Sequence, residues 1–181
     1  FAKTLKYAHN DMDALERVLS RCEYDKIKLI AIDGVFSMEG DIANLPKIVE
    51  LAEKYNASIM VDDAHGLGVL GQNGSGTSNH FGLTDKVDLI MGTFSKSLAS
   101  IGGFIAADLD TINYLKHNAR SLIFSASIAP ANAASVIAAV DLIQKEPERI
   151  QRLWDNTHYA MAALKKAGFD TGHSVTPIIP I

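Results

Sequence analysis

Four short runs of apolar residues stand out along the chain, and each of them predicts a β-strand. The runs are residues 27–32, 58–61, 87–91 and 104–107. Apolar runs of this length, without regular polar alternation, are typical of strands that are buried in a parallel sheet. We therefore expect a largely parallel sheet with right-handed crossovers between its strands.

Apolar residues at helical spacing lie between these runs and after them, which is the order of an α/β fold. Asn10 or Asp11 can cap the first helix, and Asn44 can cap the second, because their side chains accept hydrogen bonds from free backbone N–H groups. A helix that separates two strands makes a βα unit. Three further helices are expected, after Asp108, over residues 131–144 and from Pro147 to Gly168.

Two segments of the second half carry local predictions of their own. Residues 120–127 read as a short strand or an extended loop. His158 lies on the apolar stripe of the last helix, so we expect it to be packed in the core and not to be a ligand.

Polar side chains follow two of the predicted strands at the point where each strand ends. Asp62, Asp63 and His65 come after residues 58–61, and Lys96 follows residues 87–91 within a loop of small residues. In open α/β sheets, ligands bind beyond the carboxyl ends of the strands. A lysine there can form a Schiff base, and pyridoxal phosphate needs such a lysine together with a carboxylate for its ring nitrogen. Lys96 taken alone reads more readily as a solvated loop residue than as a catalytic one.

Three motifs, in the same order along the chain, resemble those of a known family. They are GVFSMEGD at residues 34–41, VDDAHGLG at 61–68 and GTFSKS at 92–97. The resemblance is to the α-oxoamine synthases, which are fold-type-I, pyridoxal-phosphate-dependent acyltransferases. Within that family, the last motif and the FSAS of residues 124–127 look most like bacterial serine palmitoyltransferases.

The resemblance implies a fold and a division of the chain. Residues 1–146 would belong to the cofactor-binding large domain, an aminotransferase-like mostly parallel sheet with helices on both faces. Residues 147–181 would be the linking helix and the start of a small C-terminal domain. The family also builds its site between two subunits, which implies a homodimer.

Site roles follow from the same resemblance. Lys96 would hold pyridoxal 5'-phosphate and later act as general base, Asp62 would hold the ring nitrogen protonated, and His65 would lie at the ring. The reaction implied is the decarboxylative condensation of L-serine with a long-chain acyl-CoA to a 3-ketosphinganine. The hydroxyl groups expected near the phosphate or the ring hydroxyl are those of Ser37, Thr93, Ser95 and Ser127, with Ser125 as an alternative to Ser127 and a simple turn role open for Ser37.

The choice between the two neighbouring aspartates rests on strand geometry. Adjacent side chains at a strand end point to opposite sides, so only one can meet the cofactor ring. The Asp-x-x-His spacing of the family falls on Asp62 and His65. We therefore expect Asp62 to carry the ring nitrogen and Asp63 to be structural.

Several alternatives remain open at this point. A sibling α-oxoamine synthase would use glycine or alanine in place of serine, as in 8-amino-7-oxononanoate or 2-amino-3-ketobutyrate synthesis. A non-catalytic partner subunit would lack the lysine, and Lys96 is present. A metal hydrolase using Asp62, Asp63 and His65 would leave Lys96 unexplained. The glycines of residues 66–71 match a dinucleotide pattern, but turn residues follow them where that pattern requires a helix.

Composition narrows the class of protein further. The chain has 181 residues, 48% of them hydrophobic, and a formal net charge of −4, which argues against nucleic acid as the main partner. Its single cysteine excludes an internal disulfide and a four-cysteine zinc site, and no metal is expected. No run is long enough to span a bilayer. We expect an internal piece of a longer cytoplasmic protein, with peripheral membrane attachment left open.

Overall fold

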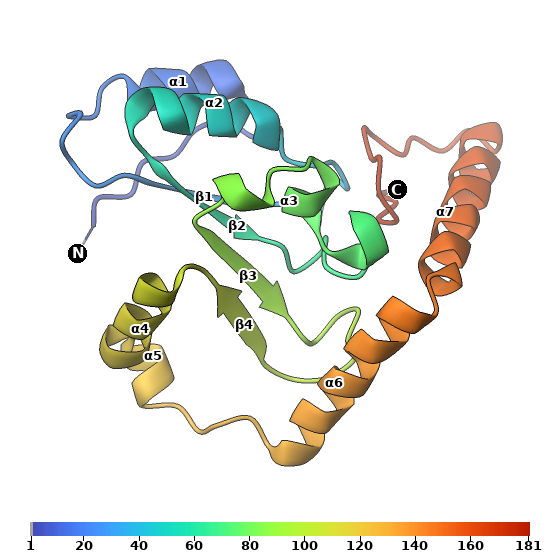
Figure 1. The fold of residues 1–181 in the computed structure, drawn as a ribbon. Coiled ribbons are helices and arrows are strands. Elements are labelled where there is room, and N and C mark those ends of the chain that lie inside the picture. The colour runs from blue at the N-terminus through green and yellow to red at the C-terminus, as the bar shows by residue number, and fades with distance from the viewer. Residues whose placement is uncertain (1) are drawn as a thin grey trace.

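The computed structural model describes residues 2–181 and contains a mixed four-stranded sheet of order β1-β2-β3-β4 (Figure 1). β1 to β3 run parallel, as the apolar runs predict, and β4 pairs antiparallel with β3. The loop of residues 94–102 that joins β3 to β4 explains this difference, because a parallel pairing needs a crossover of about a dozen residues or more. The strands are β1 (Leu29–Asp33), β2 (Ser58–Asp62), β3 (Leu89–Thr93) and β4 (Gly103–Ala106).

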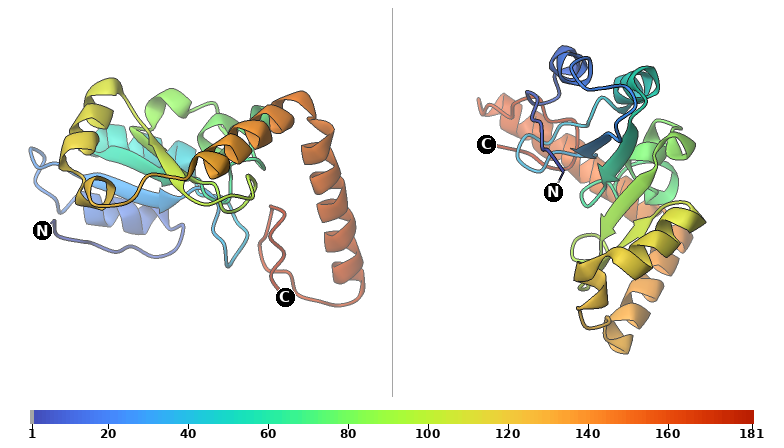
Figure 2. Two further views of the ribbon diagram at one scale, coloured as in Figure 1. Left: turned by 90° about the horizontal axis from the view of Figure 1, so that it is seen from below. Right: turned by 90° about the vertical axis from the view of Figure 1, so that its left-hand side faces the viewer.

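Two helices, α1 (Met12–Leu19) and α2 (Leu45–Tyr55), pack side by side on one face of β1 and β2 (Figures 1 and 2). Of the two candidate caps, Asp11 is the one used for α1, since its carboxylate accepts the Ala14 N–H at 2.8 Å. The core between helices and strands is formed by Leu15, Leu19, Ile30, Ile32, Leu45, Ile48, Val49, Leu51, Ala52, Ile59 and Val61.

Burial alternates along β1 and β2, although their sequences are almost wholly apolar. Ile30, Ile32, Ile59 and Val61 point into the helix-covered core. The alternate residues lie on the opposite face, which is open within the described part of the chain. The last residue of each strand, an aspartate, therefore faces the open side.

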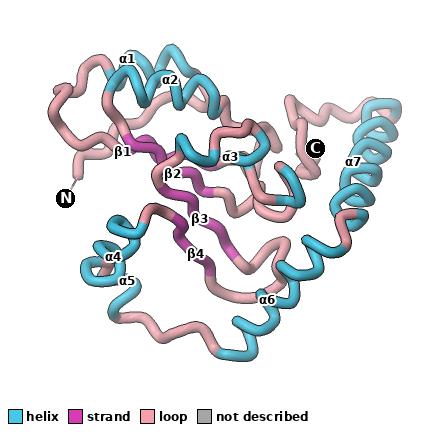
Figure 3. The backbone as a smooth tube through the Cα atoms, viewed as in Figure 1, coloured by secondary structure: helices cyan, strands magenta, loops and turns pink. Residues whose placement is uncertain are grey.

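Three short helical segments, η1, α3 and η2, lie between β2 and β3 in the chain. Helices α6 and α7 form an arm that passes the carboxyl end of β3 (Figures 1 and 3). Residues 120–123 form a helical turn, not the strand or extended loop expected, because the Phe124 N–H donates back to the Arg120 carbonyl at 3.0 Å. The remaining elements are η1 (Gln72–Gly74), α3 (Thr77–His80), η2 (Thr84–Lys86), α4 (Leu109–Asn118), α5 (Arg120–Ile123), α6 (Pro130–Lys145) and α7 (Glu148–Lys166).

Helix α7 contacts the loop that follows β2. The Trp154 indole N–H donates to the Val69 carbonyl at 3.1 Å. His158 is exposed, so the expectation of a packed core histidine is wrong: Thr157 takes the buried position, and His158 lies beside the Trp154 ring. None of the helices formed by residues 2–181 has the length and hydropathy needed to cross a membrane.

The last residues of the chain pack on the loop between β1 and α2. The Gly40 carbonyl accepts the Thr176 hydroxyl at 2.8 Å and the Val175 N–H at 3.1 Å. Thr176 and Ser174 are buried there. This contact fixes the loop that carries Ser37 to a segment far along the sequence.

Candidate functional site

The carboxyl ends of β1, β2 and β3 bring polar residues to one edge of the sheet. Asp33 ends β1, Asp62 ends β2 and Thr93 ends β3. Asp33 and Asp62 are direct partners in the parallel register, and Asp62 is in turn the partner of Met91 on β3. Polar residues therefore gather at the carboxyl ends of three neighbouring strands.

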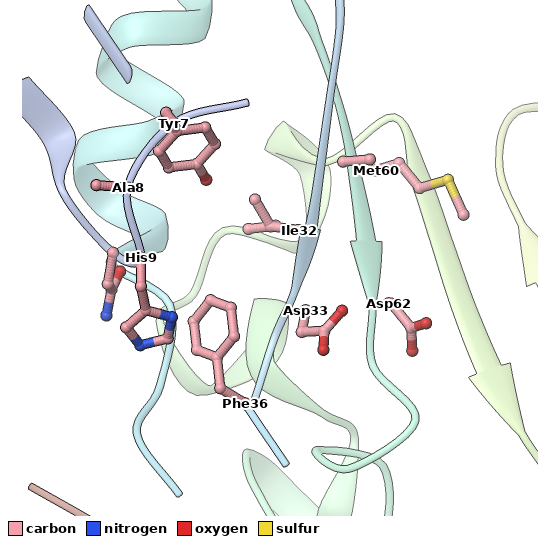
Figure 4. A pocket seen from close by; sticks show the side chains of 10 residues that line it. Tyr7, Ala8, His9, Ile32, Asp33, Phe36, Met60 and Asp62 are labelled. Atoms are coloured by element: carbon pink, nitrogen blue, oxygen red, sulfur yellow. The ribbon is translucent and has the colours of Figure 1, made fainter. Parts of the chain in front are cut away.

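Asp62 is a half-buried carboxylate with one oxygen already engaged. Its Oδ1 accepts the Ala64 N–H at 3.0 Å, which fixes the side chain at the strand end. Within residues 2–181, no hydrogen bond reaches the other oxygen. The side chain opens into a cavity of about 510 Å³ that Asp33, Met60 and Phe36 also line (Figure 4).

Asp63 points the other way and is buried. Its two oxygens accept the Thr77 N–H at 2.7 Å and the Thr77 hydroxyl at 2.6 Å. Burial raises the pKa of the Asp63 carboxyl, while the bonds from Thr77 act against that rise. The opposite orientations of Asp62 and Asp63 follow the alternation expected at a strand end.

Two glycines of the loop after β2 make room for this carboxylate. A Cβ on Gly66 or on Gly76 would lie 2.0 Å or 1.9 Å from an Asp63 oxygen. Gly68 has a different neighbour, because a Cβ there would lie 2.6 Å from the Ser97 Cβ, next to Lys96. The loop continues into η1, so no long helix opens at these glycines.

His65 and Lys96 face a second cavity, of about 370 Å³, which α6 and α7 close with apolar side chains such as Ile143 and Ile150. Burial, and after it the charge of Lys96, lowers the pKa of the His65 imidazole. The ring is therefore neutral at neutral pH and can both donate and accept a hydrogen bond. Lys96 is exposed, and its amine meets no hydrogen-bond or ion-pair partner among the described residues.

The loop that carries Lys96 is shaped by its own backbone. The Phe94 N–H donates to the Gly102 carbonyl at 2.9 Å, and the Ser100 N–H donates to the Phe94 carbonyl at 2.8 Å. The Ser100 hydroxyl also reaches the Asn132 carbonyl of α6 at 3.3 Å. These bonds close the loop on itself and tie it to α6.

The structure separates the four residues whose hydroxyl groups were predicted near the cofactor into one adjacent pair and two isolated serines. Thr93 and Ser95 lie together, with their oxygens 2.9 Å apart at the start of the lysine loop. Ser37 and Ser127 are exposed on separate loops, and neither lines the two cavities described above. Of the four hydroxyl groups, only those of Thr93 and Ser95 lie next to each other within residues 2–181.

Asp33 is a site residue that the sequence analysis did not select. Burial and the neighbouring charge of Asp62 raise the pKa of its carboxyl, while His65 and Lys96 act in the opposite direction. The available signal was its place directly after an apolar run, the same signal that identified Asp62.

A metal centre of Asp62, Asp63 and His65 does not form, because Thr77 occupies both oxygens of Asp63. Within residues 2–181, the group with metal-ligand proximity is His9, Glu39 and Asp41. There the His9 Nε2 pairs with the Asp41 carboxylate at 3.0 Å, at the surface.

Comparison with known families decides where the chain belongs. The model of the family described as aminotransferase class I and II matches residues 2–181. The chain belongs to the aminotransferase class I and II family. The fold resembles that of family members of known structure: one described as SPT with a PLP internal aldimine aligns with a TM-score of 0.89 and 34% identity, covering 96% of this chain and 43% of that one.

Curated members of the aminotransferase class I and II family are similar over the entire chain. A serine palmitoyltransferase of Sphingobacterium spiritivorum is 60% identical over 181 residues, which is 100% of this chain and 45% of the relative. An 8-amino-7-oxononanoate synthase of Thermosipho melanesiensis is 51% identical over 180 residues, covering 99% and 46%. The chain thus spans a little under half the length of these relatives.

Proposed function

We propose that the chain is part of a pyridoxal-phosphate-dependent α-oxoamine synthase that condenses L-serine with a long-chain acyl-CoA, releasing carbon dioxide and CoA. The observation that carries the proposal is the gathering of Lys96, His65 and Asp62 at one edge of the sheet. The similarity to serine palmitoyltransferases, at about 60% identity, supports L-serine as the amino acid.

The side chains present suit the cofactor. The aldehyde of the cofactor requires an amine without a partner. Its pyridine nitrogen requires a carboxylate with a free oxygen, and its phosphate requires hydroxyl groups that lie next to each other. In the described part of the chain these belong to Lys96, to Asp62, and to Thr93 with Ser95. Pyridoxal phosphate, when bound, supplies a protonated ring that takes up the electron pair left at the substrate Cα.

The residues of the chain then have separable tasks. Asp62 would accept a hydrogen bond from the ring nitrogen and keep its proton in place. His65, neutral because of its lowered pKa, would donate or accept a hydrogen bond at the ring. Lys96 Nζ would bind the cofactor and, after the serine amine has taken that place, would accept the proton from Cα.

Ser37 and Ser127 complete the proposal in different ways. Ser37 stands on the loop after β1 and would approach the ring hydroxyl or the phosphate. Ser127 is exposed ahead of α6, which suits a hydroxyl that meets the phosphate of a second subunit in a homodimer.

The direct test of this function uses Lys96→Ala in the full-length protein. Borohydride reduction should fix the cofactor to the wild-type protein at Lys96, and the variant should lose both the visible Schiff-base absorbance and the condensation. Lys165→Ala, in the last turn of α7, is the matched control and should behave as wild type. A label that maps to another lysine would remove Lys96 from its role.

A second candidate is an 8-amino-7-oxononanoate synthase, favoured by the relatives that are about 51% identical. The same site would then take alanine. A screen of L-serine, glycine and L-alanine, each with long-chain and short-chain acyl-CoA, separates the two. Preferred consumption of L-alanine would replace the serine proposal and keep the acyltransferase class.

A further inference from the structure

Asp33 places a second carboxylate beside Asp62. The two residues are register partners on parallel strands, which run about 4.8 Å apart. Both side chains lie on the open face of the sheet and line the same cavity, as Figure 4 shows. Within residues 2–181, the Asp33 carboxylate has neither a hydrogen bond nor an ion pair to a side chain.

The strand order decides how Asp33 can act. Asp62 lies on β2, between β1 with Asp33 and β3, which leads to Lys96. Asp33 is therefore one strand farther from the lysine loop than Asp62. A group bound between Lys96 and Asp62 would contact Asp62, and Asp33 would lie on the far side of Asp62 from that group.

Few other charges face this pair. Asp62, His65 and Lys96 act electrostatically on Asp33. Asp33 is exposed within residues 2–181, so solvent screens part of this interaction while the cavity is empty. His9 lines the same cavity, but its ring is paired with Asp41. Tyr7 is half-buried there, and burial raises the pKa of its hydroxyl, which keeps it neutral.

We propose that Asp33 is a positioning residue whose negative charge acts through Asp62 to keep the ring nitrogen of the bound cofactor protonated. The inference rests on the proposed function, since it needs a ring nitrogen held by Asp62. It assigns Asp33 no bond to the substrate. Its effect is to add negative potential where a positive charge on the ring must be maintained.

The first test follows the ring nitrogen itself in the full-length holoenzyme. The cofactor is labelled with ¹⁵N, and its chemical shift is recorded in wild type, Asp33→Asn, Asp33→Glu and Glu39→Gln. Glu39 is an exposed carboxylate on the loop after β1 and controls for the loss of one negative charge. The Asp33→Asn signal should move toward that of the neutral ring, Asp33→Glu should restore it, and Glu39→Gln should match wild type.

The second test uses the protein without cofactor and reads the imidazole of His65 by NMR. The Asp33 charge raises the pKa of His65, so Asp33→Asn should lower that pKa further, and Asp33→Ser should do the same as a second neutral variant.

The third test uses Asp33→Asn in the enzyme loaded with cofactor. Exchange of the serine Cα proton should slow about tenfold, with little change in the serine concentration that half-saturates the exchange.

The outcomes separate this inference from the proposed function. If Lys96 is labelled by borohydride but the ring-nitrogen signal of Asp33→Asn equals that of wild type, Asp33 has no such role and the function stands. A variant that only lowers the melting temperature, without moving the ring-nitrogen signal, also overturns the inference. Loss of labelling at Lys96 would instead overturn the proposed function.

Discussion

At the scale of single residues, two identical side chains in sequence have opposite surroundings. Asp63 is 2% exposed and holds both the N–H and the hydroxyl of Thr77, whereas Asp62 opens into a cavity with one oxygen free. Strand alternation produces this difference, and the sequence allowed it to be anticipated. The partner of Asp63 could not be anticipated, because Thr77 reaches it through a glycine-rich loop whose path no periodicity describes.

The two aspartates should therefore respond differently to the same substitution. Asp62→Asn keeps the size but removes the charge that the proposed function places at the ring nitrogen. Exchange of the serine Cα proton with deuterated solvent should therefore slow by about 10²–10³-fold. Asp63→Asn should leave that rate within about tenfold of wild type. Exchange measured by NMR on full-length protein checks both values, and a slower rate in Asp63→Asn than in Asp62→Asn would reverse the assignment.

At the scale of elements, the loop after β2 and the loop after β3 support each other. Gly68 has φ +78° and lies against Ser97, which follows Lys96 directly. A side chain at position 68 would push on the residue that places the lysine. The shape of the loop that carries Lys96 therefore depends on a glycine 28 positions before the lysine.

Gly68→Ala should weaken Schiff-base formation by about tenfold to a hundredfold, because small displacements of a reacting group are costly. Gly82→Ala is the matched control: Gly82 has a similar φ of +66°, but nothing lies within 4 Å of an added Cβ. Both variants should lose comparable stability from backbone strain. Titration of the full-length apoprotein with pyridoxal phosphate, followed by absorbance, measures the difference. Equal weakening in both variants would show that strain alone is responsible.

Most helices and strands could be predicted from the sequence. The apolar runs located all four strands, and the caps and periodicity located α1, α2, α4, α6 and α7. The direction of β4 and the turn at α5 were not recovered, since loop length and local backbone bonding decide them. Of the residues named from motifs, Lys96 and His65 line one cavity and Asp62 lines another, at the same edge of the sheet. Asp33 was missed because a single carboxylate after a strand has no distinctive spacing.

At the scale of the whole molecule, several large apolar side chains are exposed along α4, α5 and α6. Phe124 is 83% exposed, Leu109 is 74% exposed and Ile137 is 66% exposed. Large apolar patches mark a contact with another surface, and we expect these side chains to form one. It includes the segment that carries Ser127, which the proposed function assigns to the phosphate of a second subunit.

We expect the full-length protein to be a homodimer in which this surface is buried. Phe124→Asp should shift the protein toward monomers and lower the condensation rate together, because a buried charge without a partner is unfavourable. Tyr159→Asp, on the exposed side of α7, is the control and should remain dimeric. Light scattering measures the mass, and a fully active wild-type monomer would contradict the proposal.

The division of the chain into a large domain of residues 1–146 and the start of a small domain at residues 147–181 stays a prediction.

The bond between the Thr176 hydroxyl and the Gly40 carbonyl has a consequence for synthesis on the ribosome. The two residues are 136 positions apart. At about 5–20 residues per second, the second partner is made roughly 7–27 s after the first. During that interval α1, β1, α2 and β2 can already form their core. The loop that carries Ser37 then has its contacts with His9 and Asn10 but not yet those with Ser174 and Thr176. A nascent chain should therefore gain protease resistance in this loop last, although the loop is among the first parts to be translated.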